Sequence, residues 1–307
     1  MIKLSKSLAC NKQDLILHFR SEADRELKLI QKTLPASKYK ESAALMNQAV
    51  SNIKDTLISE LLKQAQIEKW SNQEVLDCIL MITYVQYVVM LEKRNAIWPY
   101  EYMTFSRRIG ELWEPFCGIA FHYPIKKLTF INPPQFQDVK AILTKEINNF
   151  ITGLKIDKQD KTQLDEYFNA VWGLVTSGEI KLGLDLHFEQ DNKKTVIDFK
   201  SGFGSNEKGN TNRLLLVASI YKNLNDKHNC VILVRSREDS NNHYFQTLKH
   251  SGLWEAFCGD EAYEQIKKYT GFDLKNWVRT NVKWEEDFDS QTLKHLKQHK
   301  LEQYLIW

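Results

Sequence analysis

The sequence predicts an α/β protein in which a mixed central sheet is flanked by helices and preceded by a largely helical N-terminal region. Residues 1–97 are rich in periodic Leu, Ile, Lys and Glu, a pattern that favours helices. Residues 181–189 and 194–202 are strand-like segments that are adjacent in the chain. A helical stretch at 213–223 then precedes the apolar strand 229–236. A hairpin, a helix and a further strand in this order are typical of such a sheet.

The N-terminal region interrupts its helical pattern only at Pro35. Its most apolar run, residues 78–91, is shorter than the roughly 20 residues that a membrane-spanning helix needs. We therefore expect a buried helix there and no membrane contact. Three regions are predicted: a helical region at 1–97, a core with recognition elements at 98–285, and a C-terminal helix at 286–307, of which 291–305 is the charged helical stretch.

The middle of the chain alternates between breaks and helices. Trp98-Pro99-Tyr100 and Pro133-Pro134 are the breaks. We expect helices at 103–117, 136–154 and 161–176.

Two aspartates lie within the apolar runs of the predicted hairpin. Asp185 is in the first strand-like segment and Asp198 in the second, with Lys200 two residues further on. Residues two apart in a strand point to the same face, so Asp198 and Lys200 project together. A buried aspartate is costly unless it is paired or binds a metal. The pattern therefore indicates a cation site beside an ammonium group, although a surface hairpin with solvated ion pairs would carry the same residues.

This residue set suits phosphodiester hydrolysis. Mg²⁺ prefers a few carboxylate oxygens and retained waters, which Asp185 and Asp198 can supply together with the backbone carbonyl of Phe199. Lys200 can orient or deprotonate the attacking water or neutralise charge that develops on the phosphate.

The arrangement Asp185 … Asp198-Phe199-Lys200 resembles the core motif of the PD-(D/E)XK nucleases. The proline of that motif is absent, because Leu184 precedes the first aspartate. The resemblance implies that Asp185, Asp198 and Lys200 are catalytic and that Mg²⁺ is the cofactor.

A further acidic residue often completes the site of that family from the first core helix. The predicted helix 161–176 has one apolar face, and Glu166 on it is our first candidate for this role. Asp165 and Glu179 are alternatives, and each of the three can also be an ordinary solvated carboxylate.

Two further segments resemble bacterial type II restriction endonucleases. Residues 106–114 look like a helix of those enzymes, and residues 252–278 look like their chain after the last core strand. Arg107 and Arg108 would then contact DNA phosphates, although exposed arginines often contact only water.

The polar segment 201–213 follows the catalytic strand directly. Asn and Arg are the side chains that read adenine and guanine edges, and glycines allow close approach to a backbone. The segment is therefore either a flexible polar loop or a DNA-binding loop, whose candidates are Asn206, Lys208, Asn210, Asn212 and Arg213.

Composition agrees with a soluble intracellular enzyme that binds nucleic acid. The 307 residues are 43% hydrophobic, enough for a substantial core, and the net charge of +3 requires any DNA-binding field to come from local clustering. The five cysteines are scattered without a CxxC pair, which argues against zinc ribbons and disulfide scaffolds and favours the cytoplasm.

These features together predict a Mg²⁺-dependent type II restriction endonuclease that cuts a short sequence of double-stranded DNA and leaves 5′-phosphate and 3′-hydroxyl ends. The resemblance also implies a homodimer and a cognate DNA methyltransferase as a genetic partner. A repair or recombination nuclease on the same core is one alternative, and a helical DNA- or protein-binding protein without catalytic activity is another.

Overall fold

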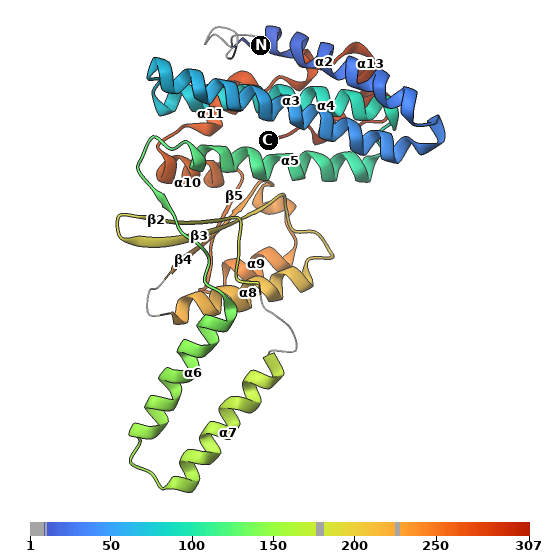
Figure 1. Cartoon of the computed structure of the whole chain (residues 1–307). Helices are drawn as coiled ribbons and strands as arrows, with labels where there is room; N and C mark the ends of the chain where they lie inside the picture. Colours follow the sequence, from blue (N-terminus) through green and yellow to red (C-terminus); the bar gives the residue numbers. More distant parts are fainter. Residues whose placement is uncertain (1–8, 10, 176–180, 225–227) are drawn as a thin grey trace.

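The chain folds into a helical layer, a five-stranded sheet with helices on its two faces, and a projecting pair of helices (Figure 1). The computed structural model describes residues 9, 11–175, 181–224 and 228–307. The helical layer contains α2 (Lys12–Thr33), α3 (Tyr39–Glu68) and α4 (Asn72–Ile97). The C-terminal helices α11 (Leu274–Asn281), α12 (Trp284–Asp287) and α13 (Ser290–Gln298) pack in the same core.

Helix α4 is the central element of the helical layer. A capping box of Ser71 and Glu74 starts it, because each side chain accepts a hydrogen bond from the other residue's backbone amide. The helix is long and apolar enough to span a membrane, but 89% of its most apolar window is buried inside the protein. The prediction that residues 78–91 form a buried helix is confirmed.

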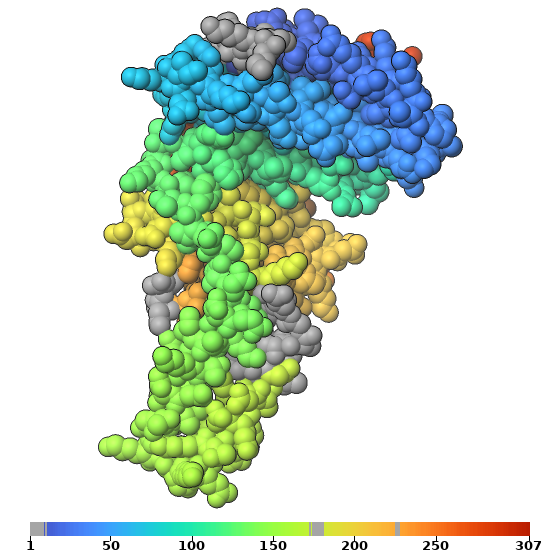
Figure 2. Space-filling view, in the orientation of Figure 1, coloured from blue at the N-terminus to red at the C-terminus, as the bar shows by residue number. Residues whose placement is uncertain are grey.

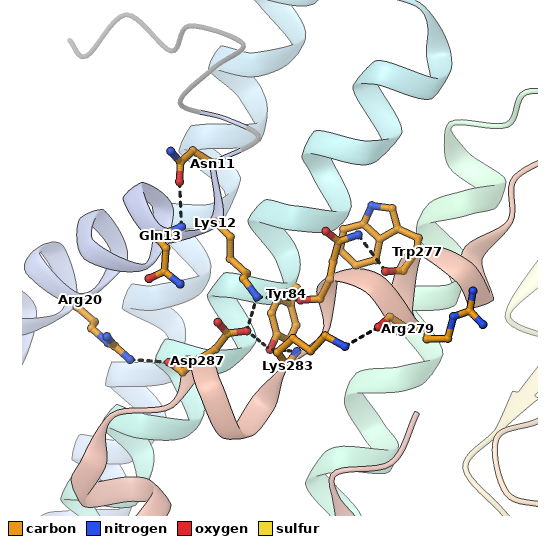
Figure 3. A network of polar contacts seen from close by, with 10 residues as sticks. Asn11, Lys12, Gln13, Arg20, Tyr84, Trp277, Arg279, Lys283 and Asp287 are labelled. Carbon is orange, nitrogen blue, oxygen red and sulfur yellow. Dashed lines mark hydrogen bonds and ion pairs between the residues drawn. The ribbon is translucent and has the colours of Figure 1, made fainter.

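A buried polar network joins the two ends of the chain in this layer (Figure 3). The carboxylate of Asp287 accepts hydrogen bonds from Lys12 Nζ at 2.9 Å and from the Tyr84 hydroxyl at 2.7 Å. Arg20 donates to the backbone carbonyl of Asp287 at 2.7 Å and pairs with the buried carboxylate of Glu92. Helices α2 and α4 are thereby fastened to the segment that precedes α13.

Helix α5 (Tyr102–His122) lies between the helical layer and the sheet (Figure 1). It contacts α4 on one side, and β3 and α10 (Asp260–Thr270) on the other. Trp113 and Phe121 of this helix make edge-to-face contacts with the buried ring of Phe199 on β3. One hydrophobic core therefore continues from the N-terminal helices to the sheet.

The sheet is mixed, as predicted, with the strand order β1-β2-β3-β4-β5. Strands β1 (Thr129–Phe130), β2 (Leu186–Gln190) and β3 (Lys193–Lys200) are antiparallel neighbours. Strands β4 (His228–Val234) and β5 (Glu255–Cys258) continue the sheet in parallel with β3. Helix α8 (Lys208–Asn223) connects β3 to β4, since parallel strands need a crossover.

Strand β3 is buried on both of its faces. Ile197 and Phe199 belong to the core shared with α5, whereas Val196 packs with the core formed by α8 and α9 (His243–Lys249). Asp198 has the same parity as Val196 and faces the α8 side of the sheet. An aspartate is therefore enclosed within a largely buried strand at the centre of the sheet.

A helical hairpin projects from the rest of the molecule. Helices α6 (Phe136–Gly153) and α7 (Lys158–Val175) lie between β1 and β2 in the chain, and α7 extends away from the sheet (Figures 1 and 2). The predicted helices at 136–154 and 161–176 are confirmed in this pair, but they do not cover the sheet along their length.

Several predicted boundaries are wrong by a few residues. The first hairpin strand begins at Leu186 rather than at 181, which places Asp185 just before it. Helix α8 begins at Lys208 rather than at 213, because the asparagines and the glycine of this segment form its first turns. Helix α13 ends at Gln298, where a left-handed residue, Lys300, stops the predicted helix 291–305.

The cysteines of the described residues are in two states. Cys117, Cys230 and Cys258 are free and buried, whereas Cys78 is disulfide-bonded. The disulfide at Cys78 departs from the reduced state that the scattered cysteines predict, and the other three described cysteines agree with it.

The Asp287 network yields a stability prediction. Asp287→Ala should lower the free energy of unfolding by about 3 kcal/mol, because it leaves the Tyr84 hydroxyl and the Lys12 ammonium without their buried acceptor. The matched control is Asp24→Ala, which removes the exposed ion pair with Lys93 and should cost less than about 1 kcal/mol. Urea denaturation at pH 7 measures both values, and equal losses would contradict the prediction.

Candidate functional site

The two predicted aspartates meet at one end of the hairpin. The pairing of Leu186 with Ile197, extended by one residue, sets Asp185 opposite Asp198. A tight turn at Asp191 and Asn192, both in the left-handed region, fixes this register. Asp185 Oδ2 accepts a hydrogen bond of 2.7 Å from the backbone amide of Phe199, so its carboxylate is tied to β3.

Residue His187 helps to hold Asp185 in place. Its Nε2 accepts a hydrogen bond of 2.9 Å from the backbone amide of Leu184, one residue before the aspartate. Burial, with a smaller contribution from His228, lowers the pKa of His187 to about 4, so this ring is neutral and can accept that bond at neutral pH.

Lysine 200 joins the two predicted metal ligands of its strand. Its Nζ forms an ion pair with Asp198 Oδ2 and donates a hydrogen bond of 3.0 Å to the backbone carbonyl of Phe199. The sequence-predicted group of Asp185, Asp198, Phe199 and Lys200 is therefore brought together at the C-terminal end of β3, the end away from the hairpin turn.

The carboxylate of Asp198 is buried, with the residue only 2% exposed. Burial raises its pKa, and the neighbouring Asp185 raises it further, whereas Lys200 and Arg213 lower it. Its Oδ2 forms an ion pair with the Lys200 ammonium. The charge of this buried carboxylate is therefore compensated by a lysine whose own side chain is mostly buried.

A third carboxylate, Glu114, comes to the site from helix α5 and was not predicted from the sequence. Burial raises the pKa of Glu114 to about 7; Lys200 opposes this shift, and Asp185 and Asp198 add to it. Its carboxylate also accepts a hydrogen bond from the backbone amide of Ser201. The charges of Glu114, Asp185 and Asp198 therefore act on one another at this strand end, where Lys200 forms its ion pair with Asp198.

Close packing at Gly110 explains how Glu114 reaches the strand end. A Cβ atom at Gly110 would lie 2.2 Å from Ser201 Oγ, so only glycine lets α5 come this near. Arg235 holds Ser201 from the other side, donating to its hydroxyl at 3.2 Å and to the carbonyl of Ile306 at 2.7 Å. In the sequence, Gly110 precedes Glu114 by one helical turn, which places both on the same face of the helix. This spacing is the pattern that could have indicated Glu114 as a site residue.

The upstream acid predicted on the helix 161–176 is not at the site. Glu166 is exposed on α7, in the part of the chain that projects from the sheet (Figure 2). Asp165 lies on the same helix and accepts a hydrogen bond from Asn169, and Glu179 lies outside the described residues. Helix α7 directly precedes the hairpin in the chain, whereas the helix that packs on β3 is α5.

The two predicted arginines lie on α5, toward its N-terminus. Arg107 and Arg108 both pair with Glu111, at 2.6 Å and 3.0 Å. The guanidinium of Arg107 is largely exposed, with 81% of its side chain accessible, so it can exchange this surface pair for another anion.

The predicted DNA-binding loop is mostly the start of helix α8. Asn206 is exposed in the turn before the helix, and Lys208, Asn210, Asn212 and Arg213 lie in its first two turns. Asn210 donates to Glu207 at 2.9 Å. Arg213 is the member nearest the site, because its charge lowers the pKa of Asp198.

The donor set for a metal is small. Among the described residues, no group of three His, Cys, Asp or Glu side chains converges closely enough to hold a metal ion. Asp185, Asp198 and the carbonyl of Phe199 are the oxygens at hand. This set suits Mg²⁺, which keeps several waters and needs one or two carboxylates.

Comparison with known proteins adds no identification. No protein-family model, no curated protein and no solved structure matches this chain.

Proposed function

We propose that this protein is a Mg²⁺-dependent endonuclease of the PD-(D/E)XK superfamily that hydrolyses phosphodiester bonds of double-stranded DNA. The observation that carries this proposal is the buried ion pair of Asp198 with Lys200, beside which the carboxylates of Asp185 and Glu114 lie close enough to change its electrostatics. A buried carboxylate is costly unless it is paired or binds a metal, and two further carboxylates beside one lysine favour a cation at this place.

The order of elements supports the proposal. Helix α5, the antiparallel strands β1 to β3, the crossover helix α8 and the parallel strand β4 follow one another in the chain. This is the sequence of elements expected of a PD-(D/E)XK core, with the α6–α7 hairpin inserted between β1 and β2. The acid pair and the lysine lie at the end of β3, where the motif requires them.

Each residue of the site then has a chemical role. Asp185, Asp198 and the Phe199 carbonyl would hold Mg²⁺, which polarises the phosphate and activates a bound water. Lys200 Nζ places a positive charge beside the carboxylates, where it can orient the attacking water and neutralise charge on the phosphate oxygens. Glu114, with its raised pKa, would complete the acidic wall from the side of α5.

Type II restriction is the specific activity that we propose. Arg107 and Arg108 would contact phosphates, and the exposed polar residues at the start of α8 would approach the bases. Cleavage of both strands of a symmetric site calls for a homodimer, and a cognate methyltransferase would protect the host DNA. The products would carry 5′-phosphate and 3′-hydroxyl ends, and the enzyme would act in the cytoplasm.

A repair or recombination nuclease would use the same cleavage centre without a methyltransferase gene nearby. Incubating plasmid DNA with Mg²⁺ and sequencing the ends distinguishes the two, since a restriction enzyme yields one recurrent end sequence. Intact DNA would instead favour the non-catalytic binding protein.

The proposed metal ligands give the first functional prediction. Asp185→Asn and Asp198→Asn should each abolish Mg²⁺-dependent cleavage, because each replaces an anionic oxygen ligand with a neutral amide. Gel-shift binding of the same DNA in Ca²⁺ should persist, which shows that the variants are folded. Cleavage at a near wild-type rate by either variant would refute the assignment.

A second prediction compares Glu114, the third carboxylate of the site, with Glu166, the acid first predicted from the sequence. Glu114→Gln should lower the cleavage rate by at least about 10²-fold above pH 7, because it removes a carboxylate that is mainly ionised above its pKa of about 7. Glu166→Gln is the matched control and should leave the rate unchanged, since Glu166 is exposed on α7. Single-turnover cleavage assays decide between them, and the opposite ranking would restore Glu166 to the site.

Arg213 tests how the start of α8 reads DNA. If Arg213 pairs with a guanine, Arg213→Ala should cost about 1–3 kcal/mol of binding and relax preference at one base position. Contact with phosphate alone should weaken binding to all sequences and reduce the salt slope by about one. Arg25→Ala, an exposed arginine of α2, serves as the control, and a variant of Arg213 indistinguishable from it would exclude a DNA contact.

A further inference from the structure

A basic pocket lies at the opposite end of the sheet from the proposed cleavage centre. Its volume is about 950 Å³, and it is bounded by the β2–β3 turn, the start of β4 and the ends of α8 and α10. Six lysines line it: Lys126, Lys127, Lys193, Lys194, Lys222 and Lys268. Strand β3 separates the two places, because it runs from Lys193 at the pocket to Lys200 at the centre, a distance of roughly 20 Å.

The charges of this pocket are poorly balanced. Among the described residues that line it, Asp191 and Glu255 are the carboxylates, against six ammonium groups. Within the part of the chain that the structure describes, no ion pair joins Lys127, Lys193 or Lys222 to a carboxylate. Like charges that converge without partners destabilise the fold by mutual repulsion, which a bound anion would relieve.

Three hydrogen bonds hold the walls of the pocket in place. Gln190 donates to the backbone carbonyls of Lys127 at 3.1 Å and Tyr269 at 2.9 Å, which ties the loop before β1 to the end of α10. At the floor, Asn229 donates to the Tyr269 hydroxyl at 3.3 Å. The lysines therefore extend from a preformed frame, and only their flexible ends need to be ordered by a ligand.

We propose that this pocket binds a compact oligophosphate anion. Several ammonium groups acting as point charges suit phosphate oxygens, and the volume is that of a small-molecule site. A pocket of this volume admits a compact anion, whereas a DNA duplex is too wide to enter it. Tyr269 in the pocket wall is buried and offers no exposed ring on which a nucleic-acid base could stack. We therefore expect the lysines to recognise the phosphates of the ligand and not a base. This site does not depend on the proposed nuclease activity.

Calorimetric titration with inorganic tripolyphosphate in low salt and EDTA tests the proposal. EDTA removes the divalent cations through which the anion could bind at the cleavage centre. The full chain should bind tripolyphosphate, and the variant Lys127→Gln/Lys193→Gln/Lys222→Gln should bind at least about tenfold more weakly. Replacing the same three residues by arginine should preserve binding, because it keeps the charges.

The matched control removes three exposed lysines outside the pocket, Lys28→Gln/Lys63→Gln/Lys294→Gln, and changes the net charge equally. It should bind like the wild type, and thermal melts should show that both glutamine variants are folded. Equal binding by the two glutamine variants, or no binding by the wild type, would overturn the proposal. So would a short DNA duplex that depends on the pocket lysines and binds more tightly than tripolyphosphate, because the ligand would then be a nucleic acid.

Discussion

The burial of one carboxylate, Asp198, is the constraint on which the arrangement of the site depends. Its strand is covered on both faces, so its charge is removed from water and its pKa rises. The ammonium of Lys200 neutralises part of this negative charge. Asp185 and Glu114 add two more carboxylates nearby. A centre of this kind is most stable with a cation, which is why we interpret it as a metal-dependent catalytic site.

Helix α5 connects this centre to the rest of the protein. Its apolar side chains Trp113 and Phe121 pack on Phe199, and Gly110 lets the helix approach Ser201 closely. Glu114 is carried to the strand end by the same contact. The helical layer behind α5, fastened by the Asp287 network, therefore supports the position of an acidic residue as well as the hydrophobic core (Figures 1 and 3).

The two ends of β3 have opposite electrostatic character. Carboxylates gather where the strand ends at Lys200, and lysines gather where it begins at Lys193. One strand thus separates a proposed cation site from a proposed anion site by roughly 20 Å. Both are built on strand ends and helix ends, where backbone geometry is fixed and side chains can converge.

The sequence by itself determined the local parts of this protein: the buried helix 78–91, the mixed sheet, and the group of Asp185, Asp198 and Lys200. These follow from hydrophobic periodicity and from the pairing of neighbouring strands, which involve residues close together in the chain. Only the tertiary structure decided which helix covers β3, because Glu114 and Glu166 both lie on amphipathic helices. The close contact of Gly110 with Ser201 brings α5 to the site, whereas α7 projects away from it, and no local pattern encodes that choice.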